Sequence, residues 1–229
     1  MEAMFLPGWR RIWPPTLERC AAGVGVKAAT ISSPNPLRRK QGMAINLAHE
    51  KASYTYEDYK GFPDHLRCEI LDGEIYDMTP APTTVHQAVA LRIVFLLERD
   101  MESKGHPCRV FMAPTDVILS DKDVVQPDVL IVCDRSKIKE AGIFGAPDVL
   151  FEVISPSTET KDRKKKRDQF ERFGVREYFI VHPDRQYVEK YTLDAGIYKK
   201  PELYEEGETF RIDTIELELK ARDLFALPE

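Results

Sequence analysis

Two short apolar runs constrain this chain more than any other feature. Residues 126–132 read QPDVLIV and residues 148–154 read DVLFEVI. Both have the β-branched composition of buried strands, yet they carry the acidic residues Asp128 and Glu152. An unpaired carboxylate in a core costs several kcal/mol, which is a large part of a domain's whole stability. We therefore expect the two carboxylates to share a cation, and their hard oxygen atoms favour Mg²⁺ or Mn²⁺ over Zn²⁺.

Strand periodicity indicates where these carboxylates point. Side chains alternate between the two faces of a strand, so Glu152 shares a face with Leu150 and Ile154. Asp128 follows Pro127, and a proline is tolerated where a strand begins. The pattern places one carboxylate within a buried strand and the other at the start of its neighbour.

Length and composition favour a globular, non-membrane protein. The chain has 229 residues, of which 43% are hydrophobic and 31% are charged. No apolar stretch is long enough to cross a bilayer. The cysteines, at positions 20, 68, 108 and 133, form no C-x-x-C pair. This spacing argues against a structural zinc site and against a disulfide framework, and we expect a reducing cytoplasm.

The first 42 residues differ from the rest of the chain. They contain Pro7, Pro14, Pro15, Pro34 and Pro36 and show no sustained periodicity. We predict a disordered or non-native extension at 1–42, with a targeting peptide as the alternative, and one domain at 43–229. The formal net charge of −5 argues against a protein that coats DNA by charge alone, although a local basic face is compatible with it.

The order of elements from residue 54 onward predicts a mixed α/β fold. A short helix is expected over 55–59, and a hairpin over 67–78 turns at Asp72-Gly73. Thr84 and Gln87 have the spacing of a capping box for a helix that ends near Gly105. The remaining expected elements are strands at 109–119, 125–133 and 149–155, a charged helix at 160–173 ended by Gly174, strands at 177–182 and 186–193, and short strands around 210–219.

A cation near the carboxylates is expected from the charged helix. Catalysis at a phosphodiester usually requires a positive group there, and the strand supplies none, because Ile154 lies two residues after Glu152. If Phe170 and Phe173 mark the buried stripe, Lys166 lies within about 40° of both around the helix axis. Lys166 could then reach over the sheet, or else belong to a solvated face. Arg163 is the next candidate, whereas Lys161, Lys164 and Lys165 are expected to face solvent.

Three further residues have two interpretations each. Glu74 follows the turn glycine and is either a third carboxylate or a solvent-facing hairpin residue. His86, in the first turn of its helix, either contacts a phosphate or a water or has a purely structural role. Gln126 precedes the Pro-Asp pair and is positioned to order the ligands around a metal.

Taken together, these motifs resemble the PD-(D/E)xK nuclease superfamily and, within it, the bacterial Uma-type putative restriction endonuclease family, a domain-of-unknown-function family. The resemblance runs from about Tyr54 to Phe225. It rests on DGE at 72–74, M-x-P at 78–80 with His86 beyond it, VVQPDVLIV at 124–132, GAPDVLFEVISPST at 145–158, D-R-x-x-K at 162–166 and GVREYFIVHPD at 174–184. Phe170, Phe179 and His182 depart from the residues common in this family.

The resemblance implies a restriction-endonuclease-like core, in which helices flank a central mixed β-sheet, with an N-terminal hairpin and C-terminal strands added. It implies Asp128 and Glu152 as metal ligands for Mg²⁺ or Mn²⁺, and a catalytic lysine that has moved from the strand to the helix, at Lys166. The function expected is a metal-dependent endonuclease acting on DNA. The alternative is a catalytically silent nucleic-acid-binding or regulatory protein on the same fold. We also expect a homodimer, because cleavage of both strands needs two sites and two-fold dimers are the commonest oligomers.

Overall fold

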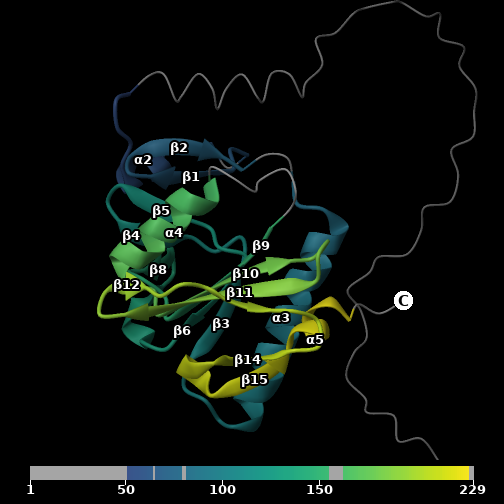
Figure 1. Ribbon diagram of the computed structural model, residues 1–229. Coiled ribbons are helices and arrows are strands. Elements are labelled where there is room, and N and C mark those ends of the chain that lie inside the picture. Colours follow the sequence, from purple (N-terminus) through teal and green to yellow (C-terminus); the bar gives the residue numbers. More distant parts are fainter. Residues whose placement is uncertain (1–50, 64, 79–80, 155–161, 227–229) are drawn as a thin grey trace, which may run out of the picture.

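The computed structural model describes residues 51–63, 65–78, 81–154 and 162–226, so the predicted extension at 1–42 lies outside it (Figure 1). The described residues form two mixed sheets, a separate two-stranded hairpin and the helices beside them. The helices are α2 (Tyr56–Lys60), α3 (Thr84–Ser103), α4 (Asp162–Phe173) and α5 (Ala221–Phe225). The mixed α/β class predicted from the sequence is confirmed.

The larger sheet has the strand order β12-β11-β10-β9-β6-β3, with β13 also paired to β11. Its members are β3 (Arg109–Met112), β6 (Val129–Val132), β9 (Val149–Val153), β10 (Glu177–His182), β11 (Tyr187–Asp194), β12 (Ile197–Tyr198) and β13 (Glu202–Tyr204). Strands β3, β6 and β9 are antiparallel neighbours, whereas β10 runs parallel to β9 after the crossover through α4. This is the expected order of helix, three strands, helix and further strand.

The smaller sheet has the order β2-β1-β5-β4-β8-β7. Its strands are β1 (Cys68–Leu71), β2 (Glu74–Asp77), β4 (Val117–Ser120), β5 (Asp123–Val125), β7 (Ile138–Lys139) and β8 (Gly142–Phe144), and a separate hairpin pairs β14 (Thr209–Ile212) with β15 (Leu217–Lys220). Strands β1 and β2 form the predicted hairpin, in which Asp72 and Gly73 both have positive φ.

Two predicted strands are each broken by a proline. The expected strand 109–119 is divided into β3 and β4 around Pro114, and the expected strand 125–133 into β5 and β6 around Pro127. Proline has no N–H for the ladder, so it ends pairing at each position. Both breaks carry the chain from one sheet to the other, and they lie together, because Ala113 N donates to the Asp128 carbonyl at 3.0 Å.

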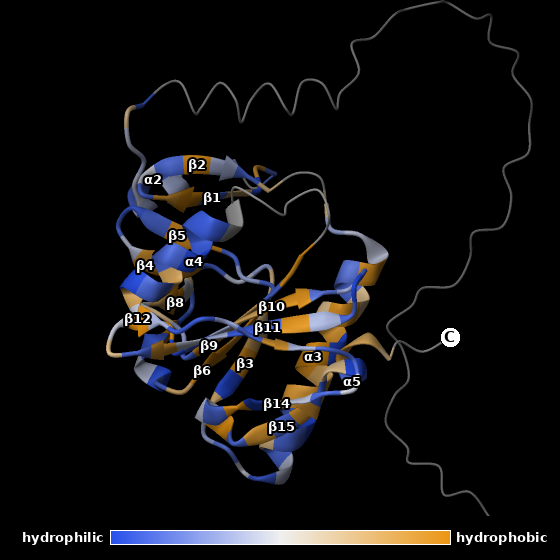
Figure 2. Cartoon of the chain, viewed as in Figure 1, coloured by the Kyte–Doolittle hydropathy of each residue, from blue (hydrophilic) through white to orange (hydrophobic). Residues whose placement is uncertain are grey.

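Each face of the larger sheet covers its own hydrophobic cluster. On one face Val149, Phe151 and Val153 pack with α3, α5 and the β14–β15 hairpin. On the other face Leu150 and Ile154 pack with Phe170 of α4 and with the smaller sheet. The alternation predicted for this strand is therefore confirmed. Figure 2 shows much of the neighbouring strand β10 in orange and most of α4 in blue, as expected for a helix with one buried stripe.

The helix ends follow local sequence signals, with one shift. Thr55 caps α2 in a capping box with Asp58, and Gly174 follows α4 with φ of 83°. The predicted capping box at Thr84 and Gln87 is wrong by one residue, because the N-cap of α3 is Thr83, whose side chain accepts from His86 N. His86 is therefore fixed in the first turn.

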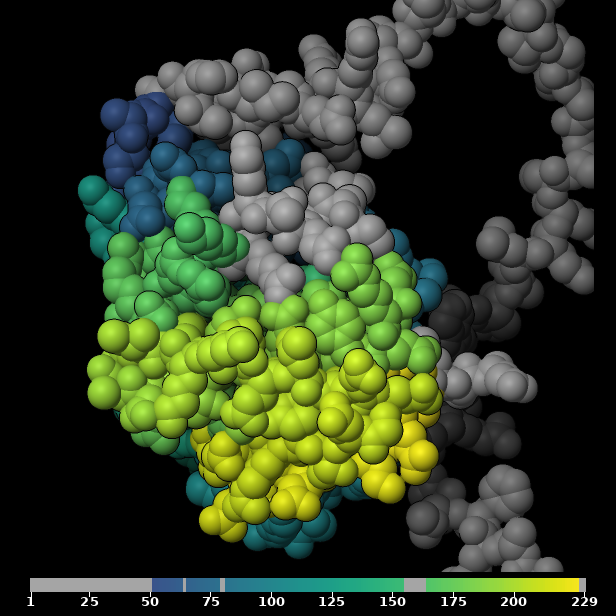
Figure 3. Space-filling model, viewed as in Figure 1, coloured from purple at the N-terminus to yellow at the C-terminus, as the bar shows by residue number. Residues whose placement is uncertain are grey.

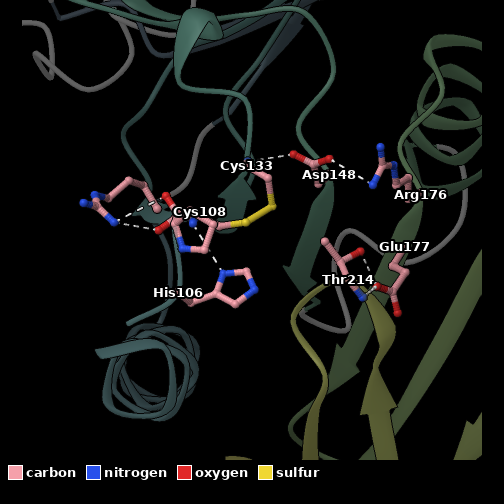
Figure 4. The surroundings of a disulfide bond; sticks show 9 residues. His106, Cys108, Cys133, Asp148, Arg176, Glu177 and Thr214 are labelled. Atoms are coloured by element: carbon pink, nitrogen blue, oxygen red, sulfur yellow. Dashed lines mark hydrogen bonds and ion pairs between the residues drawn. A yellow bond between two sulfur atoms is a disulfide. The ribbon is translucent and has the colours of Figure 1, made fainter. Parts of the chain in front are cut away.

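One expectation about the cysteines is wrong. Cys108 and Cys133 face each other at the ends of β3 and β6 and form a disulfide (Figure 4). The next residues, Arg109 and Val132, are register partners, so cross-strand pairing brings the cysteines together although they lie 25 residues apart in sequence. No cysteine spacing motif in the sequence predicts this disulfide. The cytoplasmic location stays a prediction. In the part of the chain that the structure describes, no helix is long and apolar enough to cross a membrane.

Figure 3 shows the face of the molecule formed by the C-terminal strands, with the β1–β2 hairpin at its upper edge. The hairpin belongs to the smaller sheet, whereas β10 and β11 belong to the larger one. Helix α4 contacts β1 of the smaller sheet and β12 of the larger one. Helix α4 thus lies where the two sheets meet, and it carries the predicted cation.

Candidate active site

Asp128 lies at the point where the chain passes from the smaller sheet to the larger one. Its Oδ2 accepts a hydrogen bond from Val153 N of β9 at 2.8 Å, and His86 Nε2 lies 3.0 Å from the same oxygen. A backbone donor and an imidazole thus hold one oxygen of this carboxylate. The second of these partners, His86, lies in the first turn of α3, which the Thr83 cap holds in place. His86 thus contacts a carboxylate in the structure, and its contact with a phosphate or a water stays a prediction.

Glu152 projects from β9 toward α4. Lys166 Nζ lies 3.1 Å from Glu152 Oε1, and both side chains are largely buried. The helical phase set by Phe170 and Phe173 accounts for this contact, because both aromatics pack into the cluster between α4 and the sheet. The sequence placed Lys166 on that stripe, and the structure puts it there.

Glu69 of β1 completes the group and was missed from the sequence. Lys166 Nζ lies 2.9 Å from Glu69 Oε1, closer than it lies to Glu152. The signal was available, because Glu69 is an acidic residue within the apolar strand CEIL, as Glu152 is within its own strand.

Glu74 lies away from this group. Its side chain is 67% exposed and pairs with Lys165 at 2.7 Å across the gap between the hairpin and α4. Lys165 also donates to Tyr76 Oη, so the expectation that Lys165 only faces solvent is wrong. This lysine ties the hairpin to α4. The side chain of Arg163 lies outside the described part of the structure, as does Lys161.

Gln126 lies two residues before Asp128 and contacts Glu69 of the same group. Its backbone N donates to Glu69 Oε1 at 2.9 Å, and its side-chain Nε2 donates to Asp116 Oδ1 at 2.7 Å and to Tyr59 Oη at 3.1 Å. Tyr59 in turn donates to Asp116 at 2.8 Å. Gln126 Oε1 is buried without a hydrogen-bond partner among the described residues. Sequence reasoning missed Asp116 and Tyr59, which lie far from the motif in sequence.

The group brings several carboxyl groups together in a buried site. Burial raises the pKa of Glu152 to about 8; Lys166 opposes this shift, and the charges of Asp128 and Glu69 add to it. Burial alone would lower the pKa of Lys166, but the attraction of Glu152 and Glu69 outweighs it and raises the pKa well above its ordinary value. The site therefore holds an ammonium and has more carboxylates than one ammonium can neutralise.

The donor chemistry fits a small divalent cation. Within the described residues, no group of three His, Cys, Asp or Glu side chains is arranged to hold a metal ion. Mg²⁺ is usually bound through only one or two carboxylates and keeps several waters, so two carboxylates such as Asp128 and Glu152 suffice. A bound cation would also offset the charges of Asp128 and Glu69, which add to the effect of burial on the pKa of Glu152.

Comparison with known proteins assigns the chain to a family. A family model described as "Uma2: Putative restriction endonuclease" matches residues 54–224, which is most of the chain. The chain belongs to the Uma2 family. An uncharacterized protein from Synechocystis sp. is 29% identical to this Uma2 protein over 96 residues, which are 42% of this chain and 49% of that protein. The chain thus spans about half the length of this relative.

A solved structure shares the fold. It is the crystal structure of a "putative nuclease belonging to DUF820" from Anabaena variabilis, with a TM-score of 0.63 and 21% sequence identity to this Uma2 protein. The match covers 75% of this chain and 97% of the other chain. At this identity the likeness shows a common fold, and the chemistry of this Uma2 protein has to be argued from its own residues.

Proposed function

We propose that this Uma2 protein is a Mg²⁺- or Mn²⁺-dependent DNA endonuclease. The observation that supports the proposal is the meeting of three side chains at one buried place: Asp128 just before β6, Glu152 of β9 and Lys166 of α4. Family membership supports a nuclease-like function in general terms. The metal requirement, the DNA substrate and the roles of the residues are our inference from the site.

In this proposal Asp128 and Glu152 are the metal ligands. A divalent cation bound by them would polarise the scissile phosphate and lower the pKa of a coordinated water. Asp128 is already oriented, because Val153 N and His86 hold its Oδ2. Lys166 lies beside Glu152, where its ammonium can offset negative charge that develops on the phosphate.

The reaction proposed is hydrolysis of a phosphodiester. A water oxygen forms a bond to phosphorus, and the bond from phosphorus to the leaving sugar oxygen breaks. The water gives up one proton and the leaving oxygen gains one, so the products are a phosphate monoester and an alcohol. Lys166 stabilises the transition state by its charge, and no covalent intermediate with the protein is needed.

The test is cleavage of supercoiled plasmid by the full chain with Mg²⁺ or Mn²⁺. We expect nicked and linear products that disappear with EDTA and with Glu152→Ala, because this variant lacks one proposed ligand. Equal cleavage by parent and Glu152→Ala would indicate a contaminating nuclease. If the parent binds DNA but does not cleave it with either metal, the silent DNA-binding alternative is favoured. In that case Lys166 stays paired with Glu69 and Glu152.

We also propose that the active form is a homodimer, because cutting both strands of a duplex requires two sites. Light scattering at micromolar concentration should then give about twice the chain mass of 26.3 kDa. A mass equal to one chain, with plasmid nicked but not linearised, would contradict the dimer while leaving the nuclease proposal in place.

A further inference from the structure

Glu69 contacts the proposed catalytic lysine from the opposite sheet. It lies on β1, is 4% exposed, and its Oε1 is 2.9 Å from Lys166 Nζ. Lys166 therefore lies between Glu69 of the smaller sheet and Glu152 of the larger sheet. Of these two carboxylates, Glu152 is a proposed metal ligand, whereas Glu69 lies outside the β6–β9 pair.

Glu69 is held in place independently of Lys166. Its Oε1 accepts from Gln126 N at 2.9 Å, and the side chain of Gln126 is anchored on Asp116 and Tyr59. Gln126 is two residues before Asp128, so the segment that positions Glu69 also positions a proposed metal ligand. This arrangement fixes the carboxylate of Glu69 where it faces the ammonium.

The need for two carboxylates follows from what metal binding would do to Lys166. A cation that takes Glu152 as a ligand also takes up its negative charge, so the attraction between Glu152 and Lys166 falls. A buried ammonium without a counter-ion is strongly unfavourable. A second carboxylate must then keep Lys166 charged and in position, and among the described residues Glu69 is the one that contacts it besides Glu152.

We propose that Glu69 is a positioning residue, the counter-ion that holds Lys166 beside the scissile phosphate once Glu152 binds metal. This inference rests on the proposed nuclease function. It assigns Glu69 a role distinct from that of a ligand. Glu69 acts through Lys166, so it should affect the rate of cleavage and leave metal affinity unchanged.

The chain provides a matched control within the same hairpin. Glu74 on β2 pairs with Lys165 at 2.7 Å, just as Glu69 on β1 pairs with Lys166 at 2.9 Å. The first pair is exposed and lies away from the site, whereas the second is buried within it. Glu69→Gln and Glu74→Gln therefore remove the same charge from neighbouring strands, each opposite an adjacent lysine of α4.

The experiment combines Mn²⁺ titration with single-turnover cleavage of plasmid by the full chain. Glu69→Gln should bind Mn²⁺ within about twofold of the parent, because Glu69 is not a ligand, and should cleave about tenfold slower or worse. Glu74→Gln should match the parent in both. In a Lys166→Ala background, Glu69→Gln should change the residual rate by less than about twofold, because its partner is already gone.

Two results would overturn the inference. If Glu69→Gln weakens Mn²⁺ binding as much as Asp128→Asn does, Glu69 is a metal ligand. If Glu69→Gln slows cleavage equally with and without Lys166, it acts by another route. Should Glu69→Gln fail to fold, Glu69→Asp, which keeps the charge on a shorter side chain, should bind Mn²⁺ like the parent and cleave at an intermediate rate. A parent that neither binds Mn²⁺ nor cleaves would refute the proposed function itself.

Discussion

Lys166→Ala should slow DNA cleavage about 100-fold or more while leaving Mn²⁺ binding nearly intact. The ammonium contacts Glu152 at 3.1 Å but is not itself a ligand, so its loss removes charge stabilisation from the transition state and leaves both metal carboxylates in place. Groups of this kind are worth about 100-fold or more in rate. Single-turnover cleavage of plasmid, with calorimetric titration of Mn²⁺ on the same preparation, measures both effects.

Two neighbouring lysines provide the controls for this variant. Lys164 is exposed, so Lys164→Ala should leave cleavage close to the parent rate. Lys165 pairs with Glu74 and Tyr76, so Lys165→Ala should lower the melting temperature modestly and cost little turnover. If all three variants lose activity together with DNA affinity, the run of basic residues is a phosphate-binding face and Lys166 has no special role.

Local signals in the sequence were enough to predict most of the core. Alternation in DVLFEVI gave the correct faces for Glu152 and its neighbours, because a buried strand has apolar residues on both sides and one exception stands out. The phase of Phe170 and Phe173 selected Lys166 from several basic residues, because only one stripe of α4 is buried. Turn and cap residues located the hairpin and the end of α4.

The missing parts depend on contacts between segments distant in sequence. Glu69 stands out as the acidic residue of its strand, but a strand of four residues does not show which face it occupies, and its partner Lys166 is nearly a hundred residues away. The pairing of Glu74 with Lys165 spans 91 residues in the same way. The passage of the chain from one sheet to the other at Pro114 and Pro127 could not be predicted from the sequence either. A proline shows that strand pairing ends but does not show where the next strand pairs.

Asp128→Asn should strongly weaken Mn²⁺ binding. The substitution removes the charge of a proposed ligand while keeping its shape, so the hydrogen bond from Val153 N can persist and the fold should survive. Because a ligand that binds only the folded state stabilises it, Mn²⁺ should also raise the melting temperature of the parent, and this effect should be lost in Asp128→Asn.

The central claim is that a divalent cation binds between Asp128 and Glu152, and calorimetric titration of Mn²⁺ into metal-free protein tests it most directly. We predict one or two sites in the parent, with binding strongly weakened in Asp128→Asn and in Glu152→Gln, and unchanged in Glu74→Gln, which removes a carboxylate outside the site. Equal Mn²⁺ affinity in the parent and in Asp128→Asn, with both proteins folded, would contradict the assignment.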